Sequence, residues 1–243
     1  MAKKIIEIKN LRYAYPDGTV ALKSVSMDIF EKESVGVIGP NGAGKSTLLL
    51  HLNGILRGSN HIKILDYEIN DKTLPLIRKS VGLVFQDPDS QLFMPTVFDD
   101  VAFGPLNMGL DSVKVNEAVC GALSAVDMRD CAKRPSHHLS LGQKKRAALA
   151  TVLSMSPRVL VLDEPSSDLD PKHRRGLIDI LKRLEVTKII ATHDLDLVLE
   201  VCQRVILLDG GELITCADAS DILKDKALLE AHGLGIPSSL CRL

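Results

Sequence analysis

Tryptophan is absent from this 243-residue sequence, and the other aromatic residues are five phenylalanines and three tyrosines. The lack of tryptophan by itself excludes little. Cysteine is more informative, because its five residues lie far apart and form no CxxC pair. This spacing excludes a disulfide framework and a cysteine zinc site, and it indicates reduced thiols in a cytosolic protein.

Long hydrophobic runs are also missing. No stretch approaches the roughly 18 consecutive apolar residues of a membrane-spanning helix, so any link to a membrane is expected through a partner. The chain starts with alternating isoleucine and glutamate, which predicts a strand and not a signal peptide. Basic residues are not in excess, and the net charge of −1 indicates no nucleic-acid partner.

Two kinds of strand are predicted. Residues 5–15 and 25–29 alternate apolar and polar side chains, which is typical of half-buried antiparallel strands. Residues 34–38 form a nearly continuous apolar run, the pattern of a parallel strand covered on both faces. This pattern recurs four times, with helical patterns between several of the runs, and predicts an α/β fold with a mostly parallel sheet. The recurrences lie at 81–85, 159–162, 188–192 and 205–208.

The middle of the chain has a different character. Residues 87–157 show helical periodicity and no buried-strand pattern, and the apolar residues of 113–126 fall on one helical face. We therefore predict a single domain over 1–243, in which a helical subdomain inserted at 87–157 separates the two parts of the core, 1–86 and 158–243.

A glycine-rich loop follows the strand at 34–38 and matches the pattern GxxxxGK[ST]. Its glycines allow backbone N–H groups to surround phosphate oxygens, and the helix that follows directs its positive end at the anion. Lys45 offers a charge to the β- and γ-phosphates, and Ser46 offers an oxygen to Mg²⁺. A glycine turn without a ligand fits this context poorly. The predicted nucleotide-binding residues are Gly39, Pro40, Asn41, Gly42, Ala43, Gly44, Lys45, Ser46 and Thr47.

Two acids end the buried run at 159–162. Asp163 is placed to hold Mg²⁺ at the carboxyl edge of the sheet, and Glu164 is a candidate general base for the attacking water. The alternative is a polar strand end before the turn at Pro165. Two further strands end in Gln86 and His193, which are candidates for the same edge. Gln86 is a candidate Mg²⁺ ligand and His193 a catalytic candidate, while a purely structural role stays open for both.

The segment Leu139-Ser-Leu-Gly-Gln143 precedes a basic helix. Ser140 and Gln143 match a capping box, in which each side chain satisfies a free backbone N–H group. A helix start with free N–H groups is also an anion receptor. The two interpretations are compatible, since the cap is able to act as a phosphate clamp.

In their order along the chain, these motifs resemble the ATP-binding-cassette (ABC) ATPases, and the resemblance covers nearly the whole chain. It implies the P-loop NTPase core with an N-terminal antiparallel β subdomain and a helical insert. It also implies a head-to-tail dimer, homodimeric or formed with a paralogue, with two sites for ATP and Mg²⁺. In each site the P-loop of one subunit faces residues 139–143 of the other, so that Ser140, Gly142 and Gln143 bind ATP in trans.

The same resemblance assigns individual roles. Gln86 senses Mg²⁺ and a transmembrane partner, His193 holds the γ-phosphate, and an aromatic residue before the P-loop stacks on adenine. Tyr15 is the predicted stacking residue, although Tyr13 lies on the same strand face. One departure is Leu141, where the family usually has glycine.

The stretch Gln86-Asp-Pro-Asp-Ser-Gln-Leu-Phe93 is similar to the ATPases of energy-coupling-factor (ECF) importers, and residues 15–19 and 192–197 to their cobalt and nickel branch. This implies an ATPase on the cytoplasmic face of the membrane, bound to a transmembrane coupling protein and a substrate-binding membrane subunit. Leu92, Phe93 and Met94 would suit a groove for a partner helix, or would pack the core of the insertion. Vitamin uptake and a soluble ABC ATPase remain the alternative functions.

Overall fold

The computed structural model describes residues 3–57 and 61–240. At the N-terminus, β1 (Lys4–Ala14) and β2 (Val20–Phe30) pair antiparallel, as the alternating pattern predicts. The chain reverses between them through hydrogen bonds of Tyr15 with Gly18 and Thr19, and the positive φ of Gly18 suits this turn. Two short strands, β4 (His61–Ile64) and β5 (Tyr67–Glu68), complete a four-stranded antiparallel sheet.

The second sheet has six strands in the order β10-β9-β3-β8-β7-β6. All neighbours are parallel except β10, which pairs antiparallel with β9 at one edge. The predicted mostly parallel sheet is thus confirmed, while the edge strand β10 was not predicted. The strands are β3 (Ser34–Ile38), β6 (Val81–Val84), β7 (Val159–Asp163), β8 (Thr187–Ala191), β9 (Arg204–Asp209) and β10 (Glu212–Asp218).

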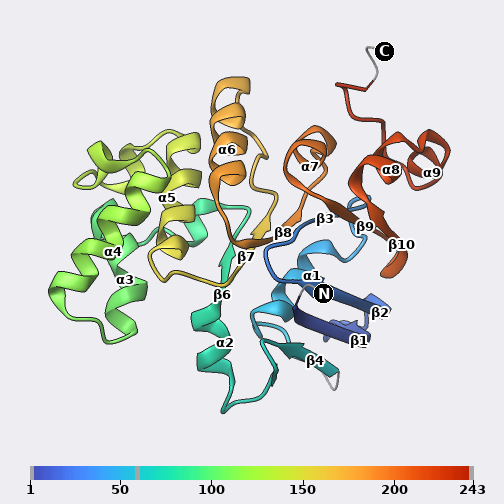
Figure 1. The fold of residues 1–243 in the computed structure, drawn as a ribbon, viewed down its shortest axis with the longest axis horizontal. Coiled ribbons are helices and arrows are strands. Elements are labelled where there is room, and N and C mark those ends of the chain that lie inside the picture. The colour runs from blue at the N-terminus through green and yellow to red at the C-terminus, as the bar shows by residue number, and fades with distance from the viewer. Residues whose placement is uncertain (1–2, 58–60, 241–243) are drawn as a thin grey trace.

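Apolar side chains pack on both faces of the six-stranded sheet, which is why its parallel strands are largely apolar, whereas the edge strand β10 is polar at both ends and not buried. In β7, Val159 and Val161 belong to one buried cluster, while Leu160 and Leu162 belong to another. Figure 1 shows α6, α7 and α8 on one side of this sheet and α1 with the antiparallel sheet on the other. These helices are α1 (Lys45–Leu52), α6 (Pro171–Arg183), α7 (Leu195–Val201) and α8 (Ala219–Lys224); α2 (Leu74–Ser80) and α9 (Lys226–Ala231) are short.

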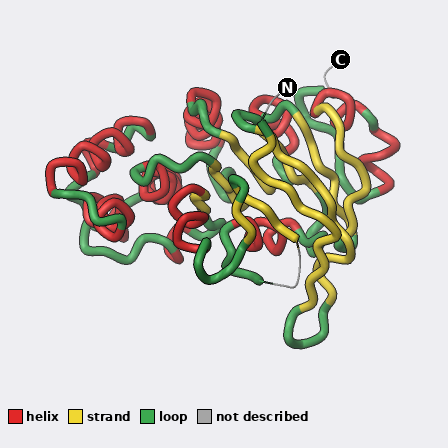
Figure 2. The backbone as a smooth tube through the Cα atoms, turned by 60° about the horizontal axis from the view of Figure 1, so that its bottom comes forward, coloured by secondary structure: helices red, strands yellow, loops and turns green. Residues whose placement is uncertain are grey.

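A helical group projects from one end of the sheet beside β6, as Figures 1 and 2 show. It contains α3 (Val97–Asn107), α4 (Ser112–Ala125), α5 (Leu141–Leu153) and three short 3₁₀ turns, with no strand between residues 87 and 157. The predicted helical insertion is therefore present, although its boundaries at 87 and 157 stay predictions. The insertion lies close to the sheet at Gly82, where an added Cβ would lie 2.0 Å from the Val152 side chain on α5. Among the described residues, no helix combines the length and apolar character needed to cross a membrane.

Candidate nucleotide-binding site

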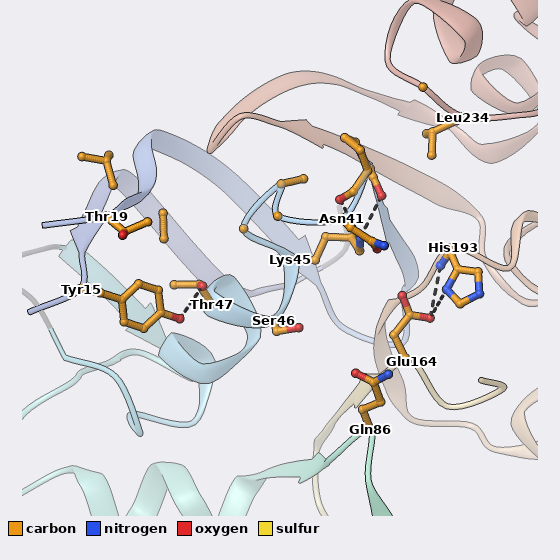
Figure 3. A pocket seen from close by; sticks show the side chains of 18 residues that line it. Tyr15, Thr19, Asn41, Lys45, Ser46, Thr47, Gln86, Glu164, His193 and Leu234 are labelled. Atoms are coloured by element: carbon orange, nitrogen blue, oxygen red, sulfur yellow. Dashed lines mark hydrogen bonds and ion pairs between the residues drawn. The ribbon is translucent and has the colours of Figure 1, made fainter. Parts of the chain in front are cut away.

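A cavity of about 700 Å³ lies at the carboxyl edge of the parallel strands. The strand order brings the segments that follow β3, β6, β7 and β8 to this edge, and their polar side chains meet there (Figure 3). The cavity is lined by Tyr15, Thr19, Val20, Ala21, residues 39–47, Gln86, Glu164, His193, Gly233 and Leu234. Most of the predicted site residues therefore surround one space.

The loop between β3 and α1 depends on glycine. At Gly39, whose φ is 150°, an added Cβ would lie 2.0 Å from the carbonyl oxygen of Leu208. Gly44 precedes α1 with a φ of 98°, and its Cβ would lie 2.6 Å from the carbonyl oxygen of Ala21. No other residue fits either position without a backbone shift, so the loop keeps a tight curve with its N–H groups available to an anion.

Lys45 is folded into this curve. Its Nζ donates hydrogen bonds to the carbonyl oxygens of Gly39, at 2.8 Å, and Pro40, at 3.1 Å. Burial lowers the pKa of Lys45, and the charges of Glu164 and Asp163 partly oppose that shift. Within the described residues, the Lys45 ammonium group has hydrogen bonds to carbonyl oxygens and no ion pair. A buried ammonium group in such surroundings favours an anionic ligand, and phosphate oxygens would supply the missing negative charge.

Asp163 ends β7 below the P-loop. Its Oδ1 atom is buried and has no hydrogen-bond partner in the described part of the protein. Burial raises the pKa of this carboxyl group, while a hydrogen bond with Ser46 and the charge of Lys45 act in the opposite direction. An unsatisfied buried carboxylate oxygen, the Ser46 hydroxyl and the Gln86 amide form an oxygen donor set that fits Mg²⁺ completed by water and phosphate oxygens.

Glu164 follows with the unusual backbone φ of 44°. Its Oε2 accepts hydrogen bonds from the Thr192 hydroxyl, at 3.0 Å, and the His193 backbone N–H, at 3.3 Å. The His193 Nδ1 lies 2.8 Å from the same oxygen. Dashed lines in Figure 3 mark the contacts between His193 and Glu164. Glu164 is buried, whereas the His193 side chain is 64% exposed and reaches solvent at the mouth of the cavity. The geometry suits a base that is oriented from one side and open on the other.

Of the two candidate tyrosines, only Tyr15 lines the cavity. Its hydroxyl lies 2.9 Å from the Thr47 Oγ1, and its ring meets the ring of Tyr13 edge-on at a centroid distance of 5.1 Å. Tyr13 packs on His51, away from the cavity lining. The location favours Tyr15, and its stacking on adenine stays a prediction.

The segment at 139–143 lies outside this cavity. The predicted capping box is confirmed: the Gln143 N–H donates to the Ser140 Oγ at 3.3 Å, and the Ser140 N–H donates to the Gln143 Oε1 at 3.0 Å. Leu141 is 39% exposed, so its side chain leaves the cap undisturbed. Gly142 is buried, and a Cβ there would lie 2.6 Å from the ring of His173. Ser140, Gly142 and Gln143 therefore do not line the cavity of their own chain, and their role in trans stays a prediction.

Of the two roles predicted for Leu92, core packing is the one observed: this side chain is 6% exposed and belongs to a buried cluster formed by the helical insertion and one face of the sheet. Phe93 is 63% exposed and lies edge-on to Phe103 at 5.1 Å. Both phenylalanines line a second cavity of about 620 Å³ between the insertion and the core. Two adjacent apolar residues of the sequence thus take different places, Leu92 in the core and Phe93 on the surface.

The sequence did not reveal several residues near the site. The Thr192 hydroxyl donates a hydrogen bond to the Glu164 carboxylate, and the Lys145 ammonium donates one to the Glu164 backbone carbonyl. Leu234, from the C-terminal segment, lines one side of the cavity. The sequence offered one clue to Lys145, because this residue lies on the buried face of a helix, where lysine is unusual. The sequence offered no clue to Leu234, because only the folded chain brings it near the P-loop.

Comparison with known proteins agrees with this geometry. The family model described as ABC transporter matches residues 22–167. A putative ABC transporter ATP-binding protein of Gloeobacter violaceus is 50% identical and aligns over 97% of this chain and 98% of its own length. The energy-coupling factor transporter ATP-binding protein EcfA of Carboxydothermus hydrogenoformans is 52% identical, over 96% of this chain and 87% of its own length.

Two solved structures have the same fold. The protein cbiO1 of Clostridium perfringens, described as part of the ABC transporter complex cbiONQ, superposes with a TM-score of 0.84 at 38% identity and covers 99% of each chain. A dimeric ATP-binding cassette bound to ADP and Pi superposes with a TM-score of 0.80 at 26% identity, over 88% of this chain and 99% of that one. This chain therefore belongs to the ABC transporter family, as one of its ATP-binding subunits.

Proposed function

We propose that this protein hydrolyses ATP to energise an ECF-type importer, with cobalt or nickel ions as the cargo. The observation that carries the ATPase assignment is the single cavity that gathers the P-loop, Glu164 and His193. Its similarity to EcfA proteins and to cbiO1 supports the importer class.

In the proposed reaction, the P-loop N–H groups and Lys45 bind the phosphates of ATP, with Tyr15 against the adenine. Ser46, Asp163 and Gln86 would hold Mg²⁺, which would neutralise negative charge on the phosphate oxygens. Glu164 orients a water molecule for in-line attack on the γ-phosphate and accepts its proton. His193 keeps the Glu164 carboxylate in place from one side and donates to the γ-phosphate from its exposed ring edge.

Each site is completed in trans. Ser140, Gly142 and Gln143 lie away from the cavity of their own chain, at the start of a capped helix where Ser140 is exposed. In a head-to-tail dimer this helix start faces the γ-phosphate bound by the other subunit, with two sites per homodimer or per dimer with a paralogous ATPase. Loss of the γ-phosphate on hydrolysis removes the bridge and opens the dimer. The dimeric state of a related cassette supports this arrangement.

The second cavity receives the transmembrane coupling protein. Its wall combines the exposed rings of Phe93 and Phe103 with the apolar side chains of Val152 and Met155. An apolar groove of this kind suits the hydrophobic face of a helix, and it lies directly beyond Gln86. The subunit would thereby sit peripherally on the cytoplasmic face of the membrane, beside a substrate-binding membrane subunit.

The decisive experiment is uptake by the complete complex reconstituted in liposomes. ATP-dependent accumulation of radioactive cobalt or nickel is expected, and it should vanish with the Glu164→Gln subunit. Accumulation of a vitamin instead of either metal would contradict the cargo and support the alternative. ATP turnover without any membrane partner or transport would support a soluble ABC ATPase.

A Phe93→Ala/Phe103→Ala variant tests the docking groove. We expect it to weaken assembly with the coupling protein at least tenfold while basal ATP turnover of the isolated subunit is retained, because neither ring lines the nucleotide cavity. Val113→Ala removes an apolar side chain of similar exposure that lies outside the groove, and serves as the control. Unchanged assembly of the double variant would exclude this groove as the docking site.

A further inference from the structure

Lys145 is a buried lysine in helix α5, five residues after the cap residue Ser140. Only 6% of its surface is exposed, and burial lowers the pKa of its amine against the opposing charges of Asp168, Glu164, Asp87 and Asp163. Lysine is among the residues least often buried unless its ammonium group has partners. The position therefore requires an explanation beyond filling space.

The partners of Lys145 belong to the backbone segment that carries the proposed base. Its Nζ donates a hydrogen bond to the carbonyl oxygen of Glu164 at 3.0 Å and another to the Ser167 Oγ at 2.8 Å. The Ser167 hydroxyl donates to the same Glu164 carbonyl at 2.9 Å. The Ser167 backbone N–H also donates to this carbonyl, at 3.2 Å. Three donors thus converge on one peptide oxygen, and the Lys145 ammonium is the one that comes from the helical insertion.

This peptide oxygen belongs to a strained residue. Glu164 has a φ of 44°, in the left-handed region that is unfavourable for a residue with a side chain. Such a backbone persists where its surroundings hold it, and the carbonyl contacts from Lys145 and Ser167 are suited to do so. A change of this φ would swing the Glu164 carboxylate away from Thr192 and His193, which both contact its Oε2.

Helix α5 links this contact to the segment at 139–143. With a rise of about 1.5 Å per residue, the Cα of Lys145 lies roughly 7.5 Å along the helix from that of Ser140. In the dimer proposed above, the start of α5 faces the nucleotide of the other subunit, while Lys145 reaches the base of its own subunit. A displacement of α5 caused by the partner's nucleotide would therefore also move the Lys145 ammonium group relative to the Glu164 carbonyl of its own subunit.

We propose that Lys145 is a positioning residue, which holds the Glu164 backbone in its active conformation and couples it to the engagement of α5 with the partner's nucleotide. This inference rests on the proposed ATPase function. It concerns the carbonyl of Glu164, and no proton transfer to or from Lys145 is part of it.

Kinetics of Lys145→Met provide the main test, because methionine fills the space of the lysine stem and removes the donor. We expect kcat for ATP to fall at least tenfold while KM stays within about twofold, since the P-loop is untouched. Lys145→Arg keeps a donor and should recover at least a third of the wild-type kcat. Lys144→Met is the matched control, because the neighbouring lysine forms an ion pair with Asp89 at 2.7 Å and should keep wild-type turnover.

Ser167→Ala provides a second test that does not alter the buried charge. It should lower kcat to an intermediate extent, and the Lys145→Met/Ser167→Ala variant should be no slower than Lys145→Met, because both side chains act on one carbonyl. The inference would be overturned if Ser167→Ala kept wild-type turnover, or if Lys145→Arg recovered none of the lost kcat. It would also be overturned if the kcat losses of the two single variants multiplied in the double variant. A Lys145→Met protein that unfolds more easily but keeps its kcat per folded molecule would overturn it as well.

Amide hydrogen exchange separates this inference from the proposed function. Lys145→Met should increase exchange of the amides at residues 164–168 at least fivefold, and Lys144→Met should not. A wild-type protein without Mg²⁺-ATP turnover would refute the proposed function, whereas unchanged exchange at 164–168 would refute the role of Lys145.

Discussion

The Nδ1 of His193 lies 2.8 Å from the Oε2 of Glu164, and the Thr192 hydroxyl lies 3.0 Å from the same oxygen. The backbone N–H of His193 also donates to Oε2, so that all three contacts fall on one oxygen of the carboxylate. The other oxygen, Oε1, takes none of these bonds. It is therefore the atom that we expect to receive a proton from the attacking water.

Glu164→Gln should lower ATP turnover by about 10²–10⁴-fold, the range of a lost general base, while ATP binding is retained. The amide keeps the shape of the carboxylate and still accepts a bond at one position. Phosphate release and nucleotide affinity measure the two effects. Glu230→Gln, in an exposed ion pair with Lys226, is the control and should be neutral. Intact turnover of Glu164→Gln would show that another group is the base.

Neighbouring positions in the 139–143 segment should respond differently to substitution. Gly142→Ala places a Cβ 2.6 Å from the His173 ring and should lower the free energy of unfolding by about 1–3 kcal/mol, the range for an overpacked site. Leu141→Gly removes an exposed side chain and should change stability by less than about 1 kcal/mol and turnover only modestly. Chemical unfolding and ATPase assays measure both. A total loss of activity in Leu141→Gly would reveal a positive role for the leucine.

Asp194 should make stability depend on acid pH. Burial opposes its ionisation, but hydrogen bonds from Arg174, the Leu197 N–H and Ser166 outweigh burial, and its pKa is lowered from the ordinary 3.8. The folded state therefore binds this proton at lower pH than the unfolded state. The stabilisation is complete above about pH 4–5 and is lost as pH falls through the folded pKa.

Asp194→Asn tests this dependence through unfolding free energies measured from pH 7 to pH 3. The variant should lose about 1–3 kcal/mol at pH 7, as for a charge-assisted hydrogen-bond partner, and its loss relative to wild type should shrink below pH 4. Asp179→Asn breaks an exposed pair with Arg175 and should change stability by less than about 1 kcal/mol. Equal losses at both pH extremes would contradict the role of ionised Asp194.

The thiols should differ in reactivity. Burial raises the pKa of the Cys202 thiol to about 12, so almost no thiolate forms at pH 8, whereas Cys120 is exposed on α4. Alkylation of the native protein, read by peptide mass spectrometry, should label Cys120 and spare Cys202 until the protein is unfolded. Rapid labelling of native Cys202 would show that its surroundings open readily.

Sequence patterns predicted the parts of the structure whose cause is local. The continuous apolar runs identified the parallel strands, and the Ser140 and Gln143 pair identified a cap that the structure confirms. Side chains at strand ends were predicted to share one edge, and Gln86, Glu164 and His193 do line one cavity. These successes follow from periodicity and from the geometry of parallel sheets.

Features that depend on tertiary packing were not predictable. Leu92 and Phe93 are adjacent apolar residues, and only the packing of the insertion decides that one is buried and the other exposed. Lys145 appears as one basic residue among three in a helix, and nothing local connects it with Glu164, nineteen positions later. The pairing of β10 at the edge also depends on where β9 lies in the sheet.

The place of β3 in its sheet has a consequence for synthesis on the ribosome. Its two neighbours are β8 and β9, so both edges of the strand that precedes the P-loop stay unpaired until residues 187–209 have emerged. Parallel pairing between distant segments is slow, and unpaired edges promote aggregation of partly made chains. A nascent chain that stops before β8 thus carries the entire phosphate-binding motif without either strand partner of β3, and we expect it to bind nucleotide only after residues 187–209 have emerged.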